Sequence, residues 1–321
     1  MKILANDGID AGGKKALEAL GFTVITEKVA QENLAQAINN DNYIGLLVRS
    51  ATTARKDLID ACPGLKFIGR GGVGIDNIDA EYARSKGIEV FNTPASSSQS
   101  VAELVMSLMF AAARGVYDAG THMPTTGDEQ FEALKKKYAK GTELRGKTLG
   151  IVGFGRIGRS LASYALGCGM KVIAYDSHQS EQPVELMIEG HGPVHVKVPF
   201  VSLAEILSSC DFVSLHVPKQ ANGAAVIGKE ELASCKKGII LVNTSRGGVI
   251  EESALIEALD NGQVAFAALD VFVGEPKPNA AILKHPKILS TPHIGASTNE
   301  AQERIGLEIA SRVQDIMKIN A

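Results

Sequence analysis

Short apolar segments of strand type alternate with helical segments along almost the whole chain, and this alternation restricts the fold more than any other feature of the sequence. One series ends near residue 92, and a second begins near residue 147. Strands that alternate with helices pair in parallel through right-handed crossovers, which place helices on both faces of a sheet. We therefore expect an α/β protein with two doubly wound parallel sheets.

The pattern predicts the following elements. The first series contains strands at 2–6, 22–26, 44–49, 65–69 and 88–92, with helices at 11–20, 31–39, 56–61 and 80–85. The second contains strands at 148–152, 171–176, 211–217, 238–244, 264–271 and 288–292, with helices at 156–167, 203–208, 229–234, 252–260 and 299–317. A long apolar helix at 101–114 lies between the two series. We expect residues 119–146 and 178–200 to be irregular.

Composition excludes several classes of protein. The 321 residues carry 33 basic and 36 acidic side chains, so no basic excess indicates binding to nucleic acid or to an anionic membrane. The apolar segment 101–113 contains Glu103 and is too short to cross a bilayer, and the N-terminus lacks the apolar stretch of a signal peptide. The four cysteines form no CxxC pair. These features predict a cytoplasmic protein in a reducing compartment.

One of two G-x-G-x-x-G motifs stands in the context that binds a dinucleotide. Gly153, Gly155 and Gly158 follow an apolar strand and open a helix, and the next strand ends on Asp176. These glycines permit a tight turn, close approach of a pyrophosphate, and close helix–strand packing. The helix N-terminus offers free N–H groups to the phosphates. Asp176 can accept from both ribose hydroxyls and would repel a 2′-phosphate, so we predict NAD rather than NADP.

The other copy, residues 69–74, lacks this context. Its helix starts several residues later, and the next strand ends on Asn92, which is not an acid. We interpret it as a loop whose backbone approaches a ligand, although a glycine-rich turn without a ligand fits equally well. His191 and His195 have the spacing of metal ligands but no third ligand accompanies them, so we expect no metal site.

Three of the last predicted strands are followed by chemically useful side chains. These are Arg246, Glu275 and His293. Ligands of open α/β sheets bind outside the carboxyl ends of the strands. Hydride transfer to a 2-keto acid needs a cation for the carboxylate and carbonyl, a proton donor, and a partner for that donor. The three residues supply one group for each task.

The order of these motifs resembles the D-isomer-specific 2-hydroxyacid dehydrogenases. The matching stretches are Gly-Phe-Gly-Arg-Ile-Gly at 153–158, Asn-Thr-Ser-Arg-Gly-Gly at 243–248, Leu-Asp-Val-Phe at 269–272 with Glu-Pro at 275–276, and Thr-Pro-His-Ile-Gly-Ala-Ser-Thr at 291–298. The resemblance implies a Rossmann-type NAD-binding domain at 95–293, inserted into a flavodoxin-like substrate domain formed by 1–94 and 294–321. It also implies a homodimer, or a tetramer, with contacts from helix 101–114 and the arm 119–146.

The same resemblance implies roles for individual residues. Arg246 would hold the substrate carboxylate and keto oxygen, His293 would be the acid and base, and Glu275 would pair with His293, favouring the protonated imidazole. The implied cofactor contacts beyond the glycines are Arg156, Ile157, Asp176, Val217, Pro218, Thr244, Ser245, Asp270, Gly295, Ala296 and Val73. The implied substrate contacts are Arg49, Ser50, Arg70, Gly71 and Gly72.

Within the family the residues most resemble the branch that oxidises 3-phosphoglycerate to 3-phosphohydroxypyruvate, the first step towards serine. Arg49 and Arg70 would hold the phosphate, aided by a partner's lysine from among Lys136, Lys137 and Lys140. Longer members of that branch continue into a serine-sensing domain, and we expect no feedback inhibition through such a domain here. One alternative is a reductase for glyoxylate or hydroxypyruvate, or a D-lactate-type dehydrogenase. Another, of a different class, is an NADH-sensing interaction protein similar to the corepressors of this fold.

Overall fold

The computed structural model describes residues 1–178, 183–220 and 222–318. The chain divides into two compact units. Unit 1 comprises Met1–Ser100 and Ala296–Ala321, and unit 2 comprises Val101–Gly295. The chain therefore passes between the units twice, after Ser100 and after Gly295.

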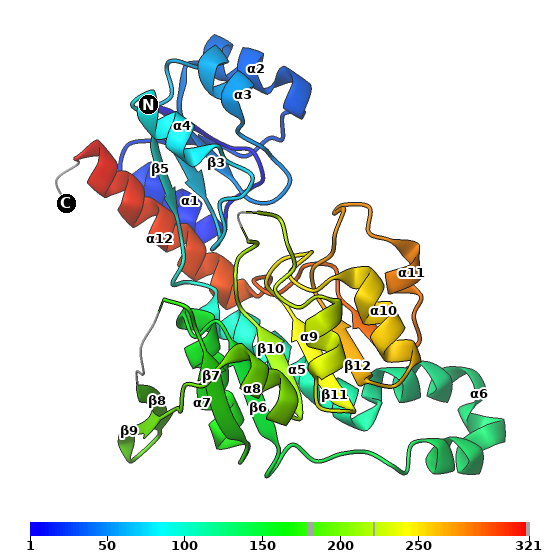
Figure 1. Ribbon diagram of the computed structural model, residues 1–321. Coiled ribbons are helices and arrows are strands. Elements are labelled where there is room, and N and C mark those ends of the chain that lie inside the picture. The colour runs from blue at the N-terminus through cyan, green and yellow to red at the C-terminus, as the bar shows by residue number, and fades with distance from the viewer. Residues whose placement is uncertain (179–182, 221, 319–321) are drawn as a thin grey trace. The chain divides into compact units, whose positions relative to one another are not determined.

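Unit 1 contains a parallel sheet (Figure 1). Its five strands have the order β2-β1-β3-β4-β5. Its strands are β1 (Lys2–Ala5), β2 (Thr23–Ile25), β3 (Tyr43–Val48), β4 (Phe67–Arg70) and β5 (Glu89–Asn92). Its helical elements are α1 (Ala11–Ala19), η1 (Gln31–Asn33), α2 (Leu34–Asp41), α3 (Lys56–Ala61), α4 (Ala80–Ser85) and α12 (Asn299–Met317). This strand order is that of flavodoxin-like sheets, whose ligands bind where the order reverses, between β1 and β3.

Successive side chains of a strand point to opposite faces of the sheet, and each face of unit 1 has its own core. Ile3 on β1 packs with Leu17 of α1 and Ile305 of α12. Its neighbour Leu4 packs on the other face, with residues of α2, α3 and α4. Helices α1 and α12 touch through two glycines: a Cβ added to Gly13 would lie 2.4 Å from the Cα of Gly306.

Unit 2 contains a six-stranded parallel sheet in the order β13-β12-β11-β10-β6-β7. Its strands are β6 (Thr148–Val152), β7 (Lys171–Tyr175), β10 (Phe212–Leu215), β11 (Ile239–Asn243), β12 (Val264–Leu269) and β13 (Ile288–Ser290). The order reverses between β6 and β10, which places the ligand crevice of a Rossmann-type sheet there. The expected α/β class with two doubly wound parallel sheets is thus confirmed.

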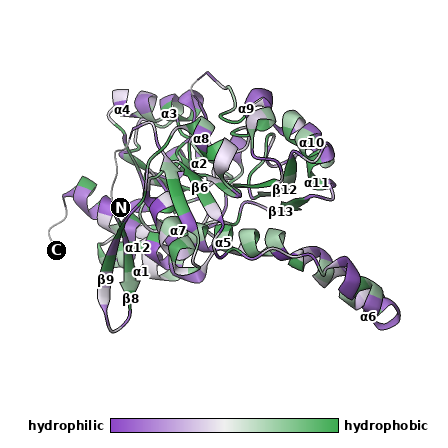
Figure 2. Ribbon diagram, turned by 60° about the horizontal axis from the view of Figure 1, so that its bottom comes forward, coloured by the Kyte–Doolittle hydropathy of each residue, from purple (hydrophilic) through white to green (hydrophobic). Residues whose placement is uncertain are grey.

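Helices cover both faces of this sheet as well. The helices of unit 2 are α5 (Ser98–Arg114), α6 (Val116–Lys137), α7 (Arg156–Gly167), α8 (Leu203–Ser209), α9 (Lys229–Ser234), α10 (Glu252–Asp260) and α11 (Ala280–Leu283). Ile151 of β6 packs with α5 and α7, and the next residue, Val152, packs with α8, α9 and α10. Figure 2 shows strands β6, β12 and β13 in the colour of hydrophobic residues.

The expectation that residues 119–146 are irregular is wrong for most of that segment. Helix α6 continues to Lys137, with Pro124 inside it and non-helical dihedral angles at Gln130. A proline removes one backbone hydrogen bond and frees a carbonyl in the preceding turn. The hydroxyls of Thr125 and Thr126 both donate to the carbonyl of His122 in this region. Figures 1 and 2 both show α6 extending away from the unit 2 sheet.

The expectation of an irregular segment at 178–200 is also wrong where the structure describes it; positions 179–182 lie outside the described residues. Strands β8 (Pro183–Ile188) and β9 (Gly192–Lys197) form an antiparallel hairpin. Val184 is buried in the core beside α7, and the turn has positive φ at Gly190 and Gly192. Val184 and Leu186 of β8 pair with Val196 and Val194 of β9, so these four apolar side chains share one face. The alternation of apolar and polar residues over Val194–Lys197 in β9 is the sequence signal for this hairpin.

Among the described residues, no single helix is both long and apolar enough to cross a membrane. Helices α5 and α6 pass that test only as a pair, with a bend of 62° between them.

Candidate functional site

The glycine loop after β6 has the backbone conformation that a dinucleotide site requires. Gly153 has φ of +94°, and an added Cβ there would lie 2.5 Å from the carbonyl oxygen of His216. An added Cβ at Gly158 would lie 2.3 Å from the carbonyl oxygen of Gly153, so both positions need glycine. Gly155 caps α7 and has open space in front of it. The backbone N–H groups of the first turn, at Arg156 and Ile157, thus border an open position at a helix N-terminus.

Asp176 follows β7 and lies next to this loop. Its Oδ2 accepts from the Phe154 N–H at 2.7 Å, and its Oδ1 accepts from the His178 N–H at 2.8 Å. The carboxylate therefore orders the glycine loop as well as marking the end of the strand. This spacing of loop, helix and acid fits NAD, whose pyrophosphate needs the open helix end and whose ribose needs an acceptor at the neighbouring strand.

The cofactor candidates at the ends of β10 and β11 lie at the same edge of the sheet. Val217 and Pro218 follow β10, directly after His216, whose burial lowers its pKa to about 4 and keeps the ring neutral at neutral pH. Thr244 and Ser245 follow β11. Ser245 is held by Asn243, whose Oδ1 accepts from both the N–H and the hydroxyl of Ser245.

His293 and Glu275 form the most direct contact among the predicted catalytic residues. The imidazole Nδ1 and the carboxylate Oε2 lie 2.8 Å apart, and each side chain is about one-third exposed. The other oxygen of Glu275 accepts from the Phe272 N–H at 2.8 Å, which fixes the carboxylate. His293 has φ of +55°, a conformation that non-glycine residues rarely adopt. The pair leaves the imidazole Nε2 as the nitrogen that can exchange a proton with a ligand.

The loop that carries His293 is tied to Asp270, which is fully buried. Asp270 Oδ1 accepts from the Thr291 hydroxyl at 2.6 Å and from the Ile294 N–H at 2.9 Å. Its Oδ2 accepts from the Gly295 N–H at 2.9 Å. Both carboxylate oxygens of Asp270, a predicted cofactor contact, therefore bind the loop that carries His293.

Arg246 is half-buried after β11, and its Nη1 donates to the Ser245 carbonyl at 2.7 Å. Gly247 follows; an added Cβ there would lie 1.9 Å from the Phe272 carbonyl oxygen, so the arginine loop packs against the loop that precedes Glu275. Strands β11, β12 and β13 are neighbours in the sheet. Arg246, Glu275 and His293 therefore lie at the carboxyl edge of three adjacent strands.

The predicted substrate residues belong to unit 1. Arg49 and Ser50 follow β3 and line a pocket of about 380 Å³ together with Lys28. Arg70 ends β4, and its guanidinium lies beside Gly72, where an added Cβ would be 2.5 Å from Nη1. The Gly72 N–H donates to the Thr93 hydroxyl at 2.8 Å. Arg49 and Ser50 thus share a pocket whose lining does not include Arg70 or Gly71.

Two cofactor candidates also belong to unit 1. The carbonyl of Val73 accepts from Asn92 Nδ2, and the carbonyl of Ala296 accepts from Gln302 Nε2 at 2.7 Å. Asn92 and Gln302 therefore order the backbone at these two positions.

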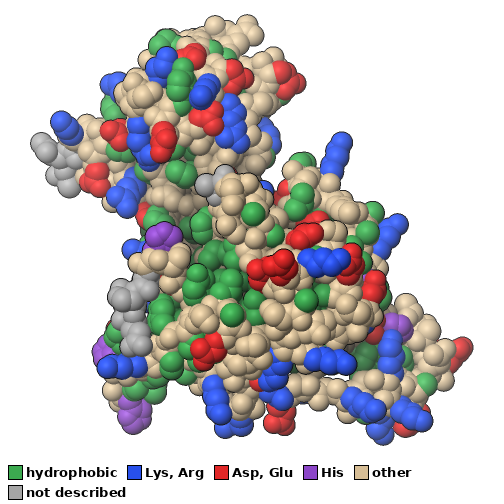
Figure 3. Space-filling model, viewed as in Figure 1, with side chains coloured by type: hydrophobic (Ala, Val, Ile, Leu, Met, Phe, Trp, Pro, Cys, Tyr) green, Lys and Arg blue, Asp and Glu red, His purple; other side chains and the backbone are tan. Residues whose placement is uncertain are grey.

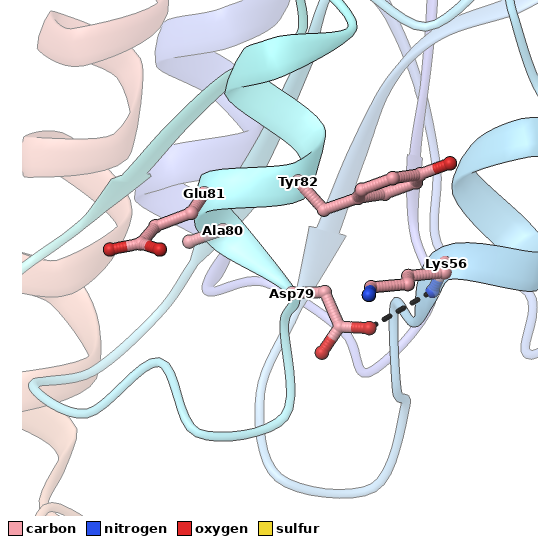
Figure 4. A pocket seen from close by; sticks show the side chains of 5 residues that line it. All are labelled: Lys56, Asp79, Ala80, Glu81 and Tyr82. Atoms are coloured by element: carbon pink, nitrogen blue, oxygen red, sulfur yellow. Dashed lines mark hydrogen bonds between the residues drawn. The ribbon is translucent and has the colours of Figure 1, made fainter. Parts of the chain in front are cut away.

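A second pocket of unit 1 lies elsewhere, beside Tyr82 (Figure 4). Its groups already satisfy one another: Asp79 accepts from the Lys56 N–H and pairs with Arg55, and the Lys56 ammonium lies 5.2 Å from the centre of the Tyr82 ring.

Basic and acidic side chains are interspersed over the face of the molecule drawn in Figure 3, without a field of one sign.

Sequence reasoning did not identify the polar residues that hold the functional loops. Asp7 and Lys28 lie at the unit 1 pocket, and Asn243 holds the loop before Arg246. A usable signal exists for all three, because Asp7 and Lys28 follow predicted strands and Asn243 lies next to the end of another, on the edge where ligands bind.

Comparison with known proteins defines the class. Residues 106–295 match the family model described as D-isomer specific 2-hydroxyacid dehydrogenase, NAD binding domain. The chain is 40% identical to human D-3-phosphoglycerate dehydrogenase over 318 residues, covering 99% of this chain and 56% of that protein. It is also 40% identical to the hydroxypyruvate reductase of Thermotoga maritima, covering 97% of each protein. The crystal structure of TT0316 protein from Thermus thermophilus matches with a TM-score of 0.86 and 30% identity, covering 99% of this chain and 97% of that one.

The chain belongs to the D-isomer specific 2-hydroxyacid dehydrogenase family, and unit 2 contains that family's NAD-binding domain. The chain spans about half the length of the phosphoglycerate dehydrogenases that it matches.

Proposed function

We propose that the protein transfers a hydride between NAD and a D-2-hydroxy acid, with 3-phosphoglycerate as the preferred substrate. The observation that supports this activity most strongly is the 2.8 Å contact between His293 and Glu275, at the carboxyl edge of the sheet that also carries the glycine loop. When bound, NAD supplies the hydride acceptor in oxidation and the donor in reduction.

The residues of unit 2 divide the remaining tasks. His293 Nε2 gives a proton to the keto oxygen in reduction and takes it from the hydroxyl in oxidation. Glu275 holds the imidazole through Nδ1 and so leaves Nε2 for the substrate. Arg246 pairs with the substrate carboxylate and polarises the carbonyl, a task for which a guanidinium fork is suited. Asp176 favours NAD over NADP because a 2′-phosphate would meet its negative charge.

Cationic residues of unit 1 support a phosphorylated substrate. Arg49 and Lys28 line one pocket, and Arg70 ends the neighbouring strand β4. Two or more cations at the carboxyl edge of a parallel sheet match the dianionic charge of a phosphate group better than the single charge of an unphosphorylated acid.

Initial rates of NADH oxidation at 340 nm, compared among 3-phosphohydroxypyruvate, hydroxypyruvate and glyoxylate, test the proposal. We expect kcat/KM to favour the phosphorylated acid by a hundredfold or more, about 2.7 kcal/mol of differential transition-state stabilisation. His293→Asn should abolish turnover of all three substrates. His285→Asn is the matched control, because His285 pairs with Asp260 away from these residues. Activity in His293→Asn would refute the catalytic assignment.

The second candidate is a reductase for unphosphorylated 2-keto acids. It is favoured by the match to the Thermotoga maritima hydroxypyruvate reductase, which covers 97% of both proteins. Comparable rates on all three acids, together with unchanged KM values in Arg49→Ala and Arg70→Ala, would support it over the phosphoglycerate proposal. Tight NADH binding without turnover, accompanied by a change in light scattering, would instead support an NADH-sensing interaction protein.

We also propose a homodimer. Helices α5 and α6 expose five large apolar side chains: Phe110, Val116, Tyr117, Met123 and Phe131. Exposed apolar side chains that gather on one part of a surface are typical of sites that bind a protein partner. Sedimentation equilibrium should give twice the chain mass, or four times for a tetramer. A Tyr117→Glu/Phe131→Glu variant should weaken the association, and a monomeric wild-type protein would refute the proposal.

The cysteines support a cytoplasmic, reducing location. All four are free thiols, and burial raises the pKa of both Cys210 and Cys235 to about 11. Proteins of oxidising compartments use cysteines differently, as paired disulfides. Cell fractionation with an antibody to the protein tests this location directly.

A further inference from the structure

The loop that carries Arg49 is organised by a buried carboxylate. Asp7 follows β1, and its side chain is only 5% exposed. Its Oδ2 accepts from the Arg49 N–H at 2.7 Å and from the Thr52 N–H at 3.0 Å. Its Oδ1 accepts from the Thr52 hydroxyl at 2.7 Å. A single carboxylate thus fixes both ends of the short loop 49–52.

Two asparagines complete this arrangement. Asn77 Nδ2 donates to the carbonyls of Arg49 and Thr52, at 2.8 and 2.7 Å. Asn6 Nδ2 donates to the Thr52 hydroxyl at 2.9 Å. The loop is therefore held from β1 on one side and from the segment after β4 on the other, and the backbone of Arg49 is fixed before any ligand binds.

The loop lies at the position where unit 1 should bind a ligand. Strands β1 and β3 are neighbours at the reversal of the strand order, and Asp7 and Arg49 follow these two strands. The pocket at that point is lined by Arg49, Ser50, Lys28 and Gly8 as well as by Asp7. The Lys28 side chain is 63% exposed, and its ammonium lies 3.9 Å from Asp7 Oδ1.

We propose that Asp7 is a positioning residue for substrate binding: it orders the loop 49–52 so that Arg49 meets the phosphate end of the substrate in this pocket. The inference rests on the proposed function, because it concerns the substrate of that reaction. On charge alone Asp7 should hinder binding, since a negative group beside an anion site opposes anion binding. Asp7 assists binding because its oxygens are engaged by loop donors and by Lys28, so that the loop is preorganised.

Loop ordering by Asp7 favours binding of the phosphate, whereas the negative charge of Asp7 opposes it. Replacement of Asp7 therefore changes KM in opposite directions in the two cases. Asp7→Ala removes all the acceptors, and Asp7→Asn removes the charge while keeping the size. If Asp7 positions Arg49, both substitutions raise the KM for 3-phosphohydroxypyruvate, by about tenfold for alanine, the loss typical of a hydrogen bond to a charged group. We expect kcat, and the KM for glyoxylate, to stay within about twofold of wild type, since neither depends on a phosphate contact. If Asp7 acts only through its charge, the KM for the phosphorylated acid falls.

Asp10→Asn is the matched control. Asp10 lies three residues away and also accepts backbone N–H groups, from Gly12 and Gly13, but it caps α1 instead of holding the loop. Its replacement should leave the KM for both keto acids unchanged. Equal losses for both keto acids in the Asp7 variants would show a general structural defect and overturn the inference.

Amide hydrogen exchange gives a readout that does not depend on turnover. In wild type, the N–H groups of Arg49 and Thr52 should exchange slowly, and more slowly still with 3-phosphoglycerate. In Asp7→Ala they should exchange faster, and the protection by 3-phosphoglycerate should be lost. Unchanged exchange in Asp7→Ala overturns the inference. If wild type turns over no 2-keto acid, the proposed function fails, and protection of this loop by 3-phosphoglycerate then decides the inference alone.

Discussion

Four carboxylates at strand ends of this chain accept backbone N–H groups from loops proposed to bind ligands. Asp7 accepts from Arg49, Asp176 from Phe154, Asp270 from Gly295, and Glu275 from Phe272. Hydrogen bonds to charged groups are stronger than those between neutral groups. These residues therefore fix loop geometry before a ligand arrives, which limits the entropy lost on binding.

Glu275 is the carboxylate whose removal should affect chemistry most. Glu275→Gln keeps the size and one acceptor but replaces the carboxylate that contacts the His293 Nδ1 by a neutral amide. We expect kcat for reduction to fall by about a hundredfold, the lower range for loss of an effective acid. The dissociation constant for NADH, measured by nucleotide fluorescence, should stay unchanged.

Glu252→Gln is the matched control for that substitution. Glu252 also accepts a backbone N–H from the same loop, that of Val273 at 2.7 Å, whereas the ring of His293 pairs with Glu275. Its replacement should leave kcat near the wild-type value. Equal losses of kcat in the two variants would mean that loop order, and not the charge next to His293, supports turnover.

At the scale of elements, Asp211 ties strand β6 to the segment after α9. Burial alone would raise its pKa, but hydrogen bonds from Lys236 Nζ and the Thr148 N–H outweigh burial and lower the pKa below its ordinary value of 3.8. The ionised form thus stabilises the fold. Asp211→Asn should lower the free energy of unfolding by about 1 kcal/mol at pH 7.

This contribution depends on pH in a definite direction. Because the folded pKa is the lower one, the stabilisation is complete above the unfolded value near 3.8 and disappears as pH falls through the folded value. Urea unfolding at pH 7 and pH 3 measures this effect. The difference in the free energy of unfolding between wild type and Asp211→Asn should be smaller at pH 3 than at pH 7. Asp41→Asn, at an exposed ion pair with Lys2, should change little at either pH. A difference that is constant with pH would contradict the assignment.

The contact between α1 and α12 reverses the usual effect of a glycine-to-alanine change. Alanine is favoured over glycine in helices by about 1 kcal/mol. At Gly306, however, an added Cβ would lie 2.8 Å from the Gly13 Cα, a backbone atom that cannot move aside. We expect Gly306→Ala to lower the melting temperature, by overpacking worth about 1–3 kcal/mol. Gly120→Ala in α6, where nothing lies within 4 Å, should raise it or leave it unchanged. A rise for Gly306→Ala would show that the helices can separate at no cost.

Most elements of both sheets follow from the sequence, because strand and helix periods are local signals. The predictions are wrong where a tertiary or side-chain contact determines the local structure, at residues 119–146 and 178–200. Pro124 favours a break, but α6 continues through it, and the hydroxyls of Thr125 and Thr126 donate to the carbonyl of His122 within the helix. The hairpin β8–β9 is fixed by the burial of Val184 next to α7. The contact between His293 and Glu275 could be predicted, because both residues follow parallel strands whose carboxyl ends lie at the same edge of the sheet. The role of Asp7 could not, because it depends on a loop 42 residues away that periodicity does not reveal.

At the scale of the whole molecule, the described hydrophobic clusters divide between the units. Two clusters flank the unit 1 sheet, and two flank the unit 2 sheet. Each unit thus has its own complete core, and only two chain crossings link them covalently. Units with separate cores can unfold as separate cooperative transitions.

This division predicts the calorimetric behaviour of the protein. We expect two unfolding transitions. NADH at a hundred times its dissociation constant should raise the melting temperature of one of them by about 5–10 °C, because the ligand adds about 2.7 kcal/mol to the free energy of unfolding of the unit that binds it. Gly306→Ala assigns the other transition, since it should lower only the melting of unit 1. A single transition that NADH and Gly306→Ala both move would contradict independent unfolding. Movement of the Gly306-sensitive transition by NADH would instead place the main cofactor contacts on unit 1, against the glycine loop and Asp176 of unit 2.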